Sequence, residues 1–521
     1  MIVFAIRVAS VGSSDCWGCD GMGVRNAPPH AGSMLESLRG LGYAPPTALA
    51  DLVDNSIAAN AGDIAVLLEW AGPESWVRIV DDGDGMDDAA LEAGMRLGAR
   101  DPRAERAATD LGRFGLGLKT ASFSQARRLT VASRKKGGSV VCLRWDLDLI
   151  GQEPGAEWPL FEGPAPGSEH LLAPLDQMAH GTVVLWEKLD RIVADGFAAT
   201  DMIELADRVE AHLAMTFHRL LDGQLPMLRL ALNGRGLKPW DPYLIGHPGK
   251  AFESLEYRIL HTTGVTVQCH VLPHRDMLKP HEQEAAAGPG GWTQQEGFYV
   301  YRNKRLLLAG GWLGLGDGGK PWPRDEAHRL ARIRLDIPNS ADADWKINVL
   351  KSTASPPVRL RSQLHRLATE TRDRARQVFA HRGHVTPVSG TRSNAVTEAW
   401  QVRRSAQGTS YRIARDHDLV ASILNRAGSL KPDILALLRL IEETVPVQRI
   451  WLDTAEDKET PRTGFAGATD NEVMETLSSM FEALVKFRGL SPTEARERLG
   501  RTPPFDRHLD LVAALEVKDA Q

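Results

Sequence analysis

The sequence Asp81-Asp82-Gly83-Asp84-Gly85-Met86 directly follows residues 76–80, in which Val77 and Ile79 face one way as in a half-buried strand. Its two glycines let the backbone come close to a bound molecule. A buried carboxylate at this place accepts a hydrogen bond from an exocyclic amine such as that of adenine. Asp81 is therefore a candidate ligand-reading residue. An acidic turn and a calcium loop are the alternatives, although apolar residues such as Met86 interrupt the calcium-loop pattern.

An amphipathic helix is predicted over residues 49–60, where apolar side chains recur at helical spacing, with Thr47 as its N-cap. Asp51 and Asn55 lie four residues apart and therefore project from one face of this helix. A carboxylate next to an amide oxygen suits a general base beside a ligand for Mg²⁺. A solvated helix face is the alternative. Strands at residues 64–70 and 76–80 are expected to follow as a hairpin.

A glycine-rich turn, Gly112-Arg113-Phe114-Gly115-Leu116-Gly117-Leu118-Lys119, is expected to run into a helix. Free backbone N–H groups at a helix start attract anions, and Lys119 adds a positive charge for a phosphate. The spacing is not that of a P-loop, and no βαβ unit surrounds it as in a dinucleotide-binding fold. A further strand is predicted over residues 181–189, beginning with Gly181-Thr182.

Together and in this order, the four segments resemble the GHKL (Bergerat-fold) ATPases, the family of type II topoisomerases, MutL and MORC proteins, heat-shock chaperones and histidine kinases. The resemblance implies ATP and Mg²⁺ as cofactors. It makes Asp51 the general base, Asn55 the Mg²⁺ ligand, Asp81 the adenine reader and residues 98–111 the nucleotide lid. The remaining ATP-binding residues that it implies are Gly83, Gly85, Met86, Gly112, Phe114, Gly115, Leu116, Gly117, Lys119 and Thr182.

Two departures from the family bear on hydrolysis. The family's hydrolases usually have Glu where this chain has Asp51, and MutL-like members usually have Asp where it has Ala58. A carboxylate shorter by one methylene still orders a water if the helix shifts, but misplacement by about 1 Å can cost a hundredfold in rate. Two hypotheses follow: an ATP-hydrolysing clamp, and a nucleotide-gated scaffold without significant hydrolysis. A chaperone-like ATPase is a third.

The second part of the chain resembles the transducer domain of MutL and MORC proteins, in which a lysine reaches the γ-phosphate. Lys351, at the end of a strand predicted over residues 345–350, fits this catalytic role best, with Lys346 as the competitor. The closest likeness, over residues 34–380, is to bacterial MORC-like (paraMORC) ATPases, which are associated with restriction-modification and phage defence. This implies a homodimer that closes on ATP and DNA-processing protein partners. No nuclease or methyltransferase motif is visible.

The fold class expected is α/β: a two-layer Bergerat-fold ATPase domain, an α/β transducer domain and a mostly helical C-terminal region. The expected boundaries are a disordered leader at 1–33, the ATPase domain at 34–195, the transducer-like domain at 196–384, a linker at 385–397 and the helical region at 398–521.

Charge and hydropathy restrict the partners. Subtracting 67 acidic from 62 basic residues gives a net charge of −5, which excludes a globally basic nucleic-acid binder. Residues 351–384 carry eight Lys or Arg against two acidic residues, net +6, so this segment either contacts DNA phosphates or is a solvated cationic face. No stretch is long and apolar enough for a membrane helix, and we expect a cytoplasmic protein.

Overall fold

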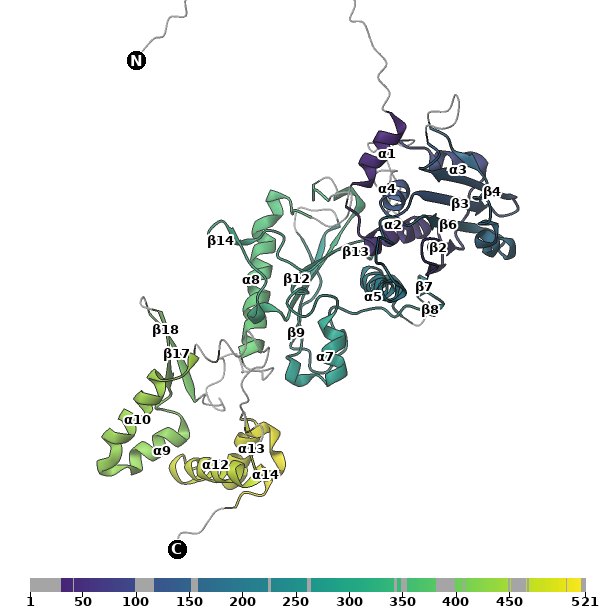
Figure 1. The fold of residues 1–521 in the computed structure, drawn as a ribbon. Helices are drawn as coiled ribbons and strands as arrows, with labels where there is room; N and C mark the ends of the chain where they lie inside the picture. Colours follow the sequence, from purple (N-terminus) through teal and green to yellow (C-terminus); the bar gives the residue numbers. More distant parts are fainter. Residues whose placement is uncertain are drawn as a thin grey trace, which may run out of the picture. The chain divides into compact units, whose positions relative to one another are not determined.

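The computed structural model describes residues 30–40, 42–98, 117–150, 158–223, 226–259, 264–341, 344–347, 354–380, 399–405, 408–447, 450, 465, 468–502 and 504–516. The chain divides into two compact units, Met1–Gly383 and His384–Gln521 (Figure 1). The mixed α/β fold class is confirmed. In the described part of the chain, no helix combines the length and the apolar character needed to cross a membrane.

The larger sheet of the first unit has the strand order β5-β4-β3-β6-β2-β1-β7-β8. Neighbouring strands are antiparallel except β1 and β7, which run parallel. The predicted hairpin is confirmed as β1 and β2, which pair from Ile64↔Asp81 to Glu69↔Trp76. The strand bounds are β1 Asp63–Glu69, β2 Trp76–Asp81, β3 Arg128–Arg134, β4 Val140–Asp146, β5 Phe161–Glu162, β6 Gly181–Glu187, β7 Arg229–Leu232 and β8 Arg235–Gly236.

Helix α2, Pro45–Ala58, carries the residues expected to do chemistry. The prediction of Thr47 as its N-cap is wrong: the N-cap is Ala44, three residues earlier, and prolines occupy the first two positions of the helix. The fixed φ of proline suits the first turn of a helix, where the missing N–H has no intrahelical partner anyway. The other helices of this layer are α1 Ala31–Arg39, α3 Asp88–Met95, α4 Gly117–Phe123, α5 Ala199–Thr216 and α6 His218–Leu221.

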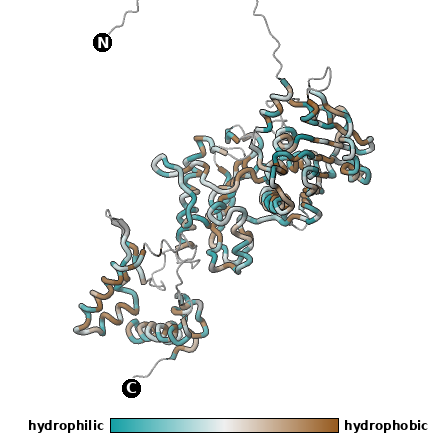
Figure 2. Tube along the Cα trace, viewed as in Figure 1, coloured by the Kyte–Doolittle hydropathy of each residue, from teal (hydrophilic) through white to brown (hydrophobic). Residues whose placement is uncertain are grey.

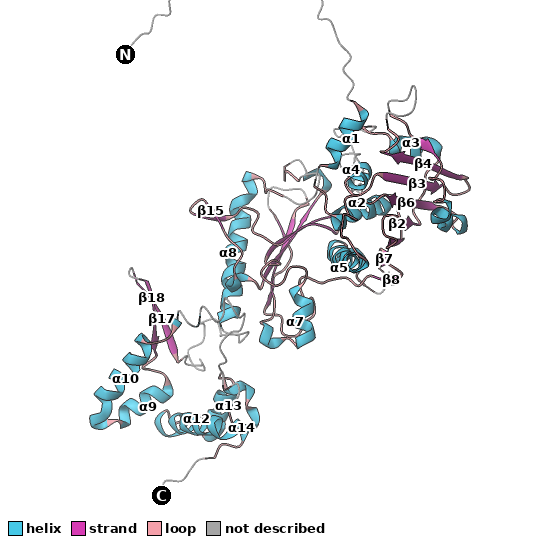
Figure 3. Ribbon diagram, in the orientation of Figure 1, coloured by secondary structure: helices cyan, strands magenta, loops and turns pink. Residues whose placement is uncertain are grey.

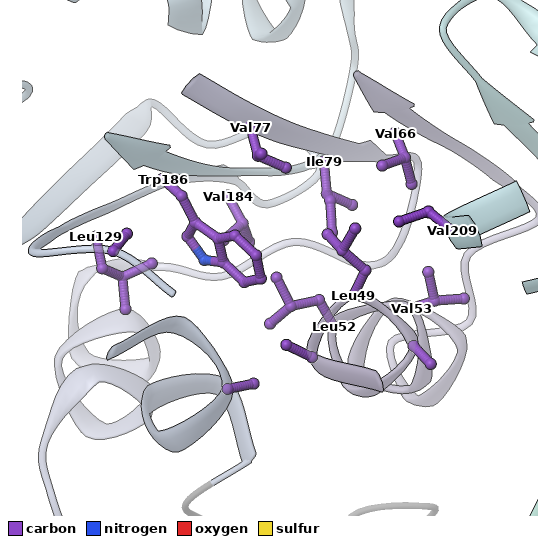
Figure 4. Packing of buried hydrophobic residues seen from close by; sticks show 14 of the residues in the cluster. Leu49, Leu52, Val53, Val66, Val77, Ile79, Leu129, Val184, Trp186 and Val209 are labelled. Carbon is purple, nitrogen blue, oxygen red and sulfur yellow. The ribbon is translucent and has the colours of Figure 1, made fainter. Parts of the chain in front are cut away.

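The core of the larger sheet lies between one face of that sheet and the helices (Figures 3 and 4). Alternate residues of β2, among them Val77 and Ile79, face Leu49 and Leu52 of α2. Asp81 follows in the same alternation, so the strand directs its carboxylate toward the helix layer. On the opposite face, residues of β3 and β6 pack against the 3₁₀ helix Glu169–Gln177.

The first sheet and its core continue beyond residue 195, where the sequence interpretation ended the ATPase domain. Strand β7 pairs with β1 from Asp63↔Arg229 to Val66↔Leu232. Helix α5 contributes buried residues, such as Val209 and Leu213, to the same core. Strand β1 thus pairs with β2 on one side and with β7 on the other, and β7 comes from the segment that was assigned to the transducer-like domain.

A second sheet has the order β10-β11-β16-β12-β13, with β9 beside β11. On β12, Phe298 and Val300 face helix α8, whereas Tyr299 and Tyr301 face the side of Met215 on α5. The bounds are β9 Phe252–Glu253, β10 Tyr257–Arg258, β11 Thr266–Val271, β12 Gly297–Arg302, β13 Arg305–Ala309, β16 Ala331–Ile337, α7 Pro280–Ala287 and α8 Val358–Ala380, with the small hairpin β14 Gly316–Asp317 and β15 Lys320–Pro321.

The strand predicted over residues 345–350 is wrong at its start. Trp345 and Lys346 lie in a turn, and Lys346 has a φ of 48°. An alternation of apolar and polar residues led to the prediction, but a positive φ is incompatible with an extended strand. Residues 348–353, including Lys351, lie outside the described residues.

The second unit contains a core formed by helices α12, α13 and α14. A hairpin, β17 with β18, adds a β element to the predicted mostly helical region. On α10, Leu437 and Leu440 are more than half exposed, and the helix stands out as hydrophobic in Figure 2. The bounds are β17 Trp400–Ser405, β18 Gly408–Ile413, α9 Asp418–Arg426, α10 Lys431–Glu443, α12 Asp470–Glu482, α13 Pro492–Gly500 and α14 Leu509–Ala513. The linker expected at 385–397 lies outside the described residues, as do residues 1–29 of the leader expected at 1–33, whereas the last three residues of that leader belong to helix α1, Ala31–Arg39.

Candidate functional site

Asp81 ends strand β2 and is 4% exposed. The Ser56 hydroxyl donates a hydrogen bond to Asp81 Oδ2 at 2.7 Å, and the Gly83 N–H donates to Oδ1 at 3.0 Å. Burial raises the pKa of Asp81, while these hydrogen bonds act in the opposite direction. Each carboxylate oxygen has two lone pairs, so a carboxylate held in this way can accept a further hydrogen bond from a ligand.

The turn after β2 requires its glycines. A Cβ atom on Gly83 would lie 2.8 Å from the carbonyl oxygen of Ala59, the C-cap of α2. Gly85 has a φ of 67°, and a Cβ there would overlap the backbone of Arg134 on β3. Met86 then donates its N–H to Ser133 Oγ at 2.8 Å. The glycines thus let this turn pass close to α2 and β3 while Asp81 stays at the strand end.

Thr182, which the resemblance names as an ATP-binding residue, lies next to Asp81 in the sheet. The two residues are direct partners in the antiparallel pairing of β2 and β6. Ser133 is the partner of Thr182 on β3, and the two hydroxyl oxygens are 2.9 Å apart. Three adjacent strands therefore bring a carboxylate and two hydroxyls together in one row.

Asp51 is 3% exposed, and Asn55 follows one turn later on α2 with an exposed side chain. The Tyr43 hydroxyl donates a hydrogen bond to Asp51 Oδ2 at 2.9 Å. Burial and the negative charge of Asp51 raise the pKa of Tyr43 above its usual range, so the phenol keeps its proton and remains a donor. The helix thus holds Asp51 inward and Asn55 toward solvent.

Lys119 lies on α4 and is 3% exposed. Its Nζ donates to the carbonyl oxygens of Gly94 at 2.8 Å and Arg96 at 3.1 Å, where α3 ends. A cation is favoured there because unpaired carbonyls gather at a helix C-terminus. Gly117 is the first residue of α4. Gly112, Phe114, Gly115 and Leu116, with residues 99–111 of the expected lid, lie outside the described residues.

Sequence reasoning missed several residues that contact the predicted ones. Ser56 had a usable signal, because it is a polar residue at a core position of α2, seven residues after Leu49 and three after Val53. Arg305 had none. Its Nη2 lies 3.0 Å from Asp54 Oδ2 and 3.7 Å from Asp51 Oδ1, although it opens a strand of the second sheet.

A buried carboxylate at the end of β2 and a turn that has no room for a Cβ thus lie together at this site. Residues 43–182 match the histidine kinase-, DNA gyrase B- and HSP90-like ATPase family. This match supports ATP binding by the domain, and ATPase activity as the general property of such domains. The matched segment extends from Tyr43, which contacts Asp51, to Thr182, the strand partner of Asp81. A comparison with curated proteins finds no match.

Proposed function

We propose that the chain binds ATP with Mg²⁺, hydrolyses it slowly with Asp51 as general base, and closes as a homodimeric clamp of the MORC or MutL kind. The observation that carries the proposal is the buried Asp81 carboxylate, hydrogen-bonded by Ser56 and Gly83, within the segment that matches the ATPase family. The alternative is a nucleotide-gated scaffold with the same ATP site and no turnover.

Each residue then has a defined task. Asp81 accepts a hydrogen bond from the adenine amine, and the Thr182 hydroxyl lies beside it. Asn55 supplies an oxygen ligand to Mg²⁺, which when bound neutralises charge on the phosphates. Lys119 and the glycine-rich turn before it hold the phosphates. Asp51 takes a proton from the attacking water, and its side chain, one methylene shorter than Glu, makes turnover slow.

The experiment that tests hydrolysis uses Asp51→Asn. The amide keeps the shape of the side chain but cannot accept the proton, so ATP affinity should persist while phosphate release stops. Asp148→Asn is the matched control, because Asp148 is a partly exposed carboxylate paired with Arg127 and Lys188. Equal phosphate release by wild type and Asp51→Asn would exclude Asp51 as the base. If the wild type binds ATP but releases no phosphate, the scaffold alternative is correct.

The clamp part of the proposal rests on the resemblance of the second region to a transducer and on Lys351. Helix α8, which follows Lys351, exposes Arg359, Arg366 and Arg376, so closure would present a cationic face to DNA phosphates. DNA-modifying or DNA-cutting proteins, in a restriction, defence or DNA-maintenance setting, are the expected partners. Light scattering with a non-hydrolysable ATP analogue should show a dimer for the wild type and a monomer for Lys351→Ala. An unchanged wild-type mass on addition of the analogue would refute the clamp.

A further inference from the structure

Arg305, the first residue of β13, joins the second sheet to the helix that carries Asp51. It is 3% exposed, and its Nε lies 3.2 Å and 3.1 Å from the two carboxylate oxygens of Asp54. Its Nη2 lies 3.0 Å from Asp54 Oδ2 and 3.7 Å from Asp51 Oδ1. One buried guanidinium therefore faces two buried carboxylates of α2 that are a single helical turn apart.

The position of Arg305 is set by the hairpin that it belongs to. Asn303 and Lys304 form a two-residue turn with φ values of 49° and 67°, as in a type I′ turn, which matches the twist of the flanking strands. Arg302 and Arg305 are consequently direct strand partners. The Arg305 Nη1 also donates to the Leu306 carbonyl at 2.7 Å. The guanidinium thus reaches α2 from a rigid support.

Asp51 is held from a second direction as well. The Tyr43 hydroxyl donates to Asp51 Oδ2, whereas Arg305 faces Oδ1. His212 of α5 lies near Arg305 and Asp54. Burial, together with the charge of Arg305, lowers the pKa of His212 to about 4, so its ring is neutral at pH 7. The positive charge of Arg305 therefore offsets the cost of burying the carboxylates of Asp51 and Asp54. Such compensation requires close contact between the opposite charges.

We infer that Arg305 is the positioning residue of the general base: Asp54 anchors its guanidinium, which holds Asp51 in place, so hydrolysis depends on the second sheet being docked against α2. This inference rests on the proposed function. An error of about 1 Å in the placement of a catalytic group can cost a hundredfold in rate, so the support of Asp51 matters even though Arg305 contacts neither the adenine nor the phosphates in this scheme. Through this contact the second sheet controls turnover rather than ATP binding.

The test compares kcat for phosphate release and KM for ATP in the full-length chain. Arg305→Gln should lower kcat at least about tenfold and leave KM within about twofold, because only the positioning of Asp51 changes. Arg305→Lys keeps the charge but not the planar fork, and should recover part of the rate. Because a lone buried charge can unfold a protein, the double variant Arg305→Gln with Asp54→Asn is included, in which two amides replace the ion pair. The double variant should be folded and as slow as Arg305→Gln alone. Both substitutions break the same contact, that between Arg305 and Asp54, so the second adds no further loss of rate.

Arg128→Gln is the matched control. Arg128, on β3 of the first sheet, pairs with the buried Asp146 at 2.9 Å, so its loss reports the cost of removing an internal ion pair. It should lower the melting temperature without lowering kcat. Unchanged kcat in Arg305→Gln, or a decrease no larger than that of Arg128→Gln, overturns the positioning role while the proposed function stands. A wild type that releases no phosphate overturns hydrolysis, and the role of Arg305 with it.

Discussion

Asp81→Asn should separate ATP binding from folding. In the variant, the amide oxygen can still accept the Gly83 N–H, and the amide nitrogen can donate to Ser56 Oγ, because a hydroxyl rotates between donating and accepting. The contacts that hold the strand end are therefore kept. What changes is the group presented to the adenine amine, since an amide nitrogen is itself a donor and two donors repel.

The size of the effect follows from the hydrogen bond that is lost. A hydrogen bond to a charged group contributes about 1.5–3 kcal/mol, and a tenfold change in affinity corresponds to about 1.4 kcal/mol, so the ATP dissociation constant should rise about 10- to 150-fold. Folding should not suffer. Burial raises the pKa of Asp81, so ionising this side chain in the folded state costs stability, a cost that a neutral amide does not have. The variant without nucleotide should unfold at the same denaturant concentration as the wild type or a higher one.

The assay is calorimetric titration with ATP and Mg²⁺, accompanied by urea unfolding of the same samples. Asp63→Asn is the control, because Asp63 is an exposed carboxylate at the start of the neighbouring strand and is paired with Arg229. It should bind ATP like the wild type. Unchanged ATP affinity in Asp81→Asn would refute the assignment of the adenine reader. A marked loss of stability without nucleotide would refute the account of how Asp81 is buried.

Two further predictions concern the stability of the first unit, one at the turn after Asp81 and one at two buried histidines. Gly85→Ala should lower the free energy of unfolding by more than the roughly 1–2 kcal/mol that a left-handed φ costs, because its Cβ would overlap Arg134; Gly137→Ala, at a φ of 76° with open space around it, should lose only the φ cost in the same urea titration. Equal losses would contradict the close approach. Burial lowers the pKa of His218 and His270 to about 3, below the value of about 6.5 in unfolded chains. The unfolded state therefore gains protons first on acidification, and each histidine should remove about 2 kcal/mol of stability between pH 7 and pH 5. Replacing His270 with Asn should flatten this dependence in urea unfolding, and an unaltered slope would show that His270 is not the cause.

The elements of the first sheet could be predicted because their signals are local. Alternation in residues 76–80 located β2, helical spacing located α2, and the glycines after Asp81 marked a turn that has no room for side chains. The two prolines at the start of α2 were also a readable signal, since proline is favoured in the first turn, but Thr47 was chosen instead.

The missing parts of the site depend on long-range pairing. Nothing near Arg305 in the sequence shows that it contacts Asp54, 251 positions earlier, because that contact follows from docking the second sheet against α2. Ser133 is a similar case, since it meets Thr182 only through the pairing of β3 with β6. Trp345 and Lys346 show the opposite failure, in which a convincing local pattern was overridden by a turn.

The parallel pairing of β7 with β1 has a practical consequence for fragments of this chain. A fragment that ends at residue 195 would keep every residue of the family match but lose β7 and helix α5. Strand β1 would then be an open edge, and Val66, now buried, would lose the apolar cover of Val209. Unpaired edges with exposed apolar side chains promote aggregation. A fragment meant for crystallisation or titration should therefore extend past β8, which ends at Gly236.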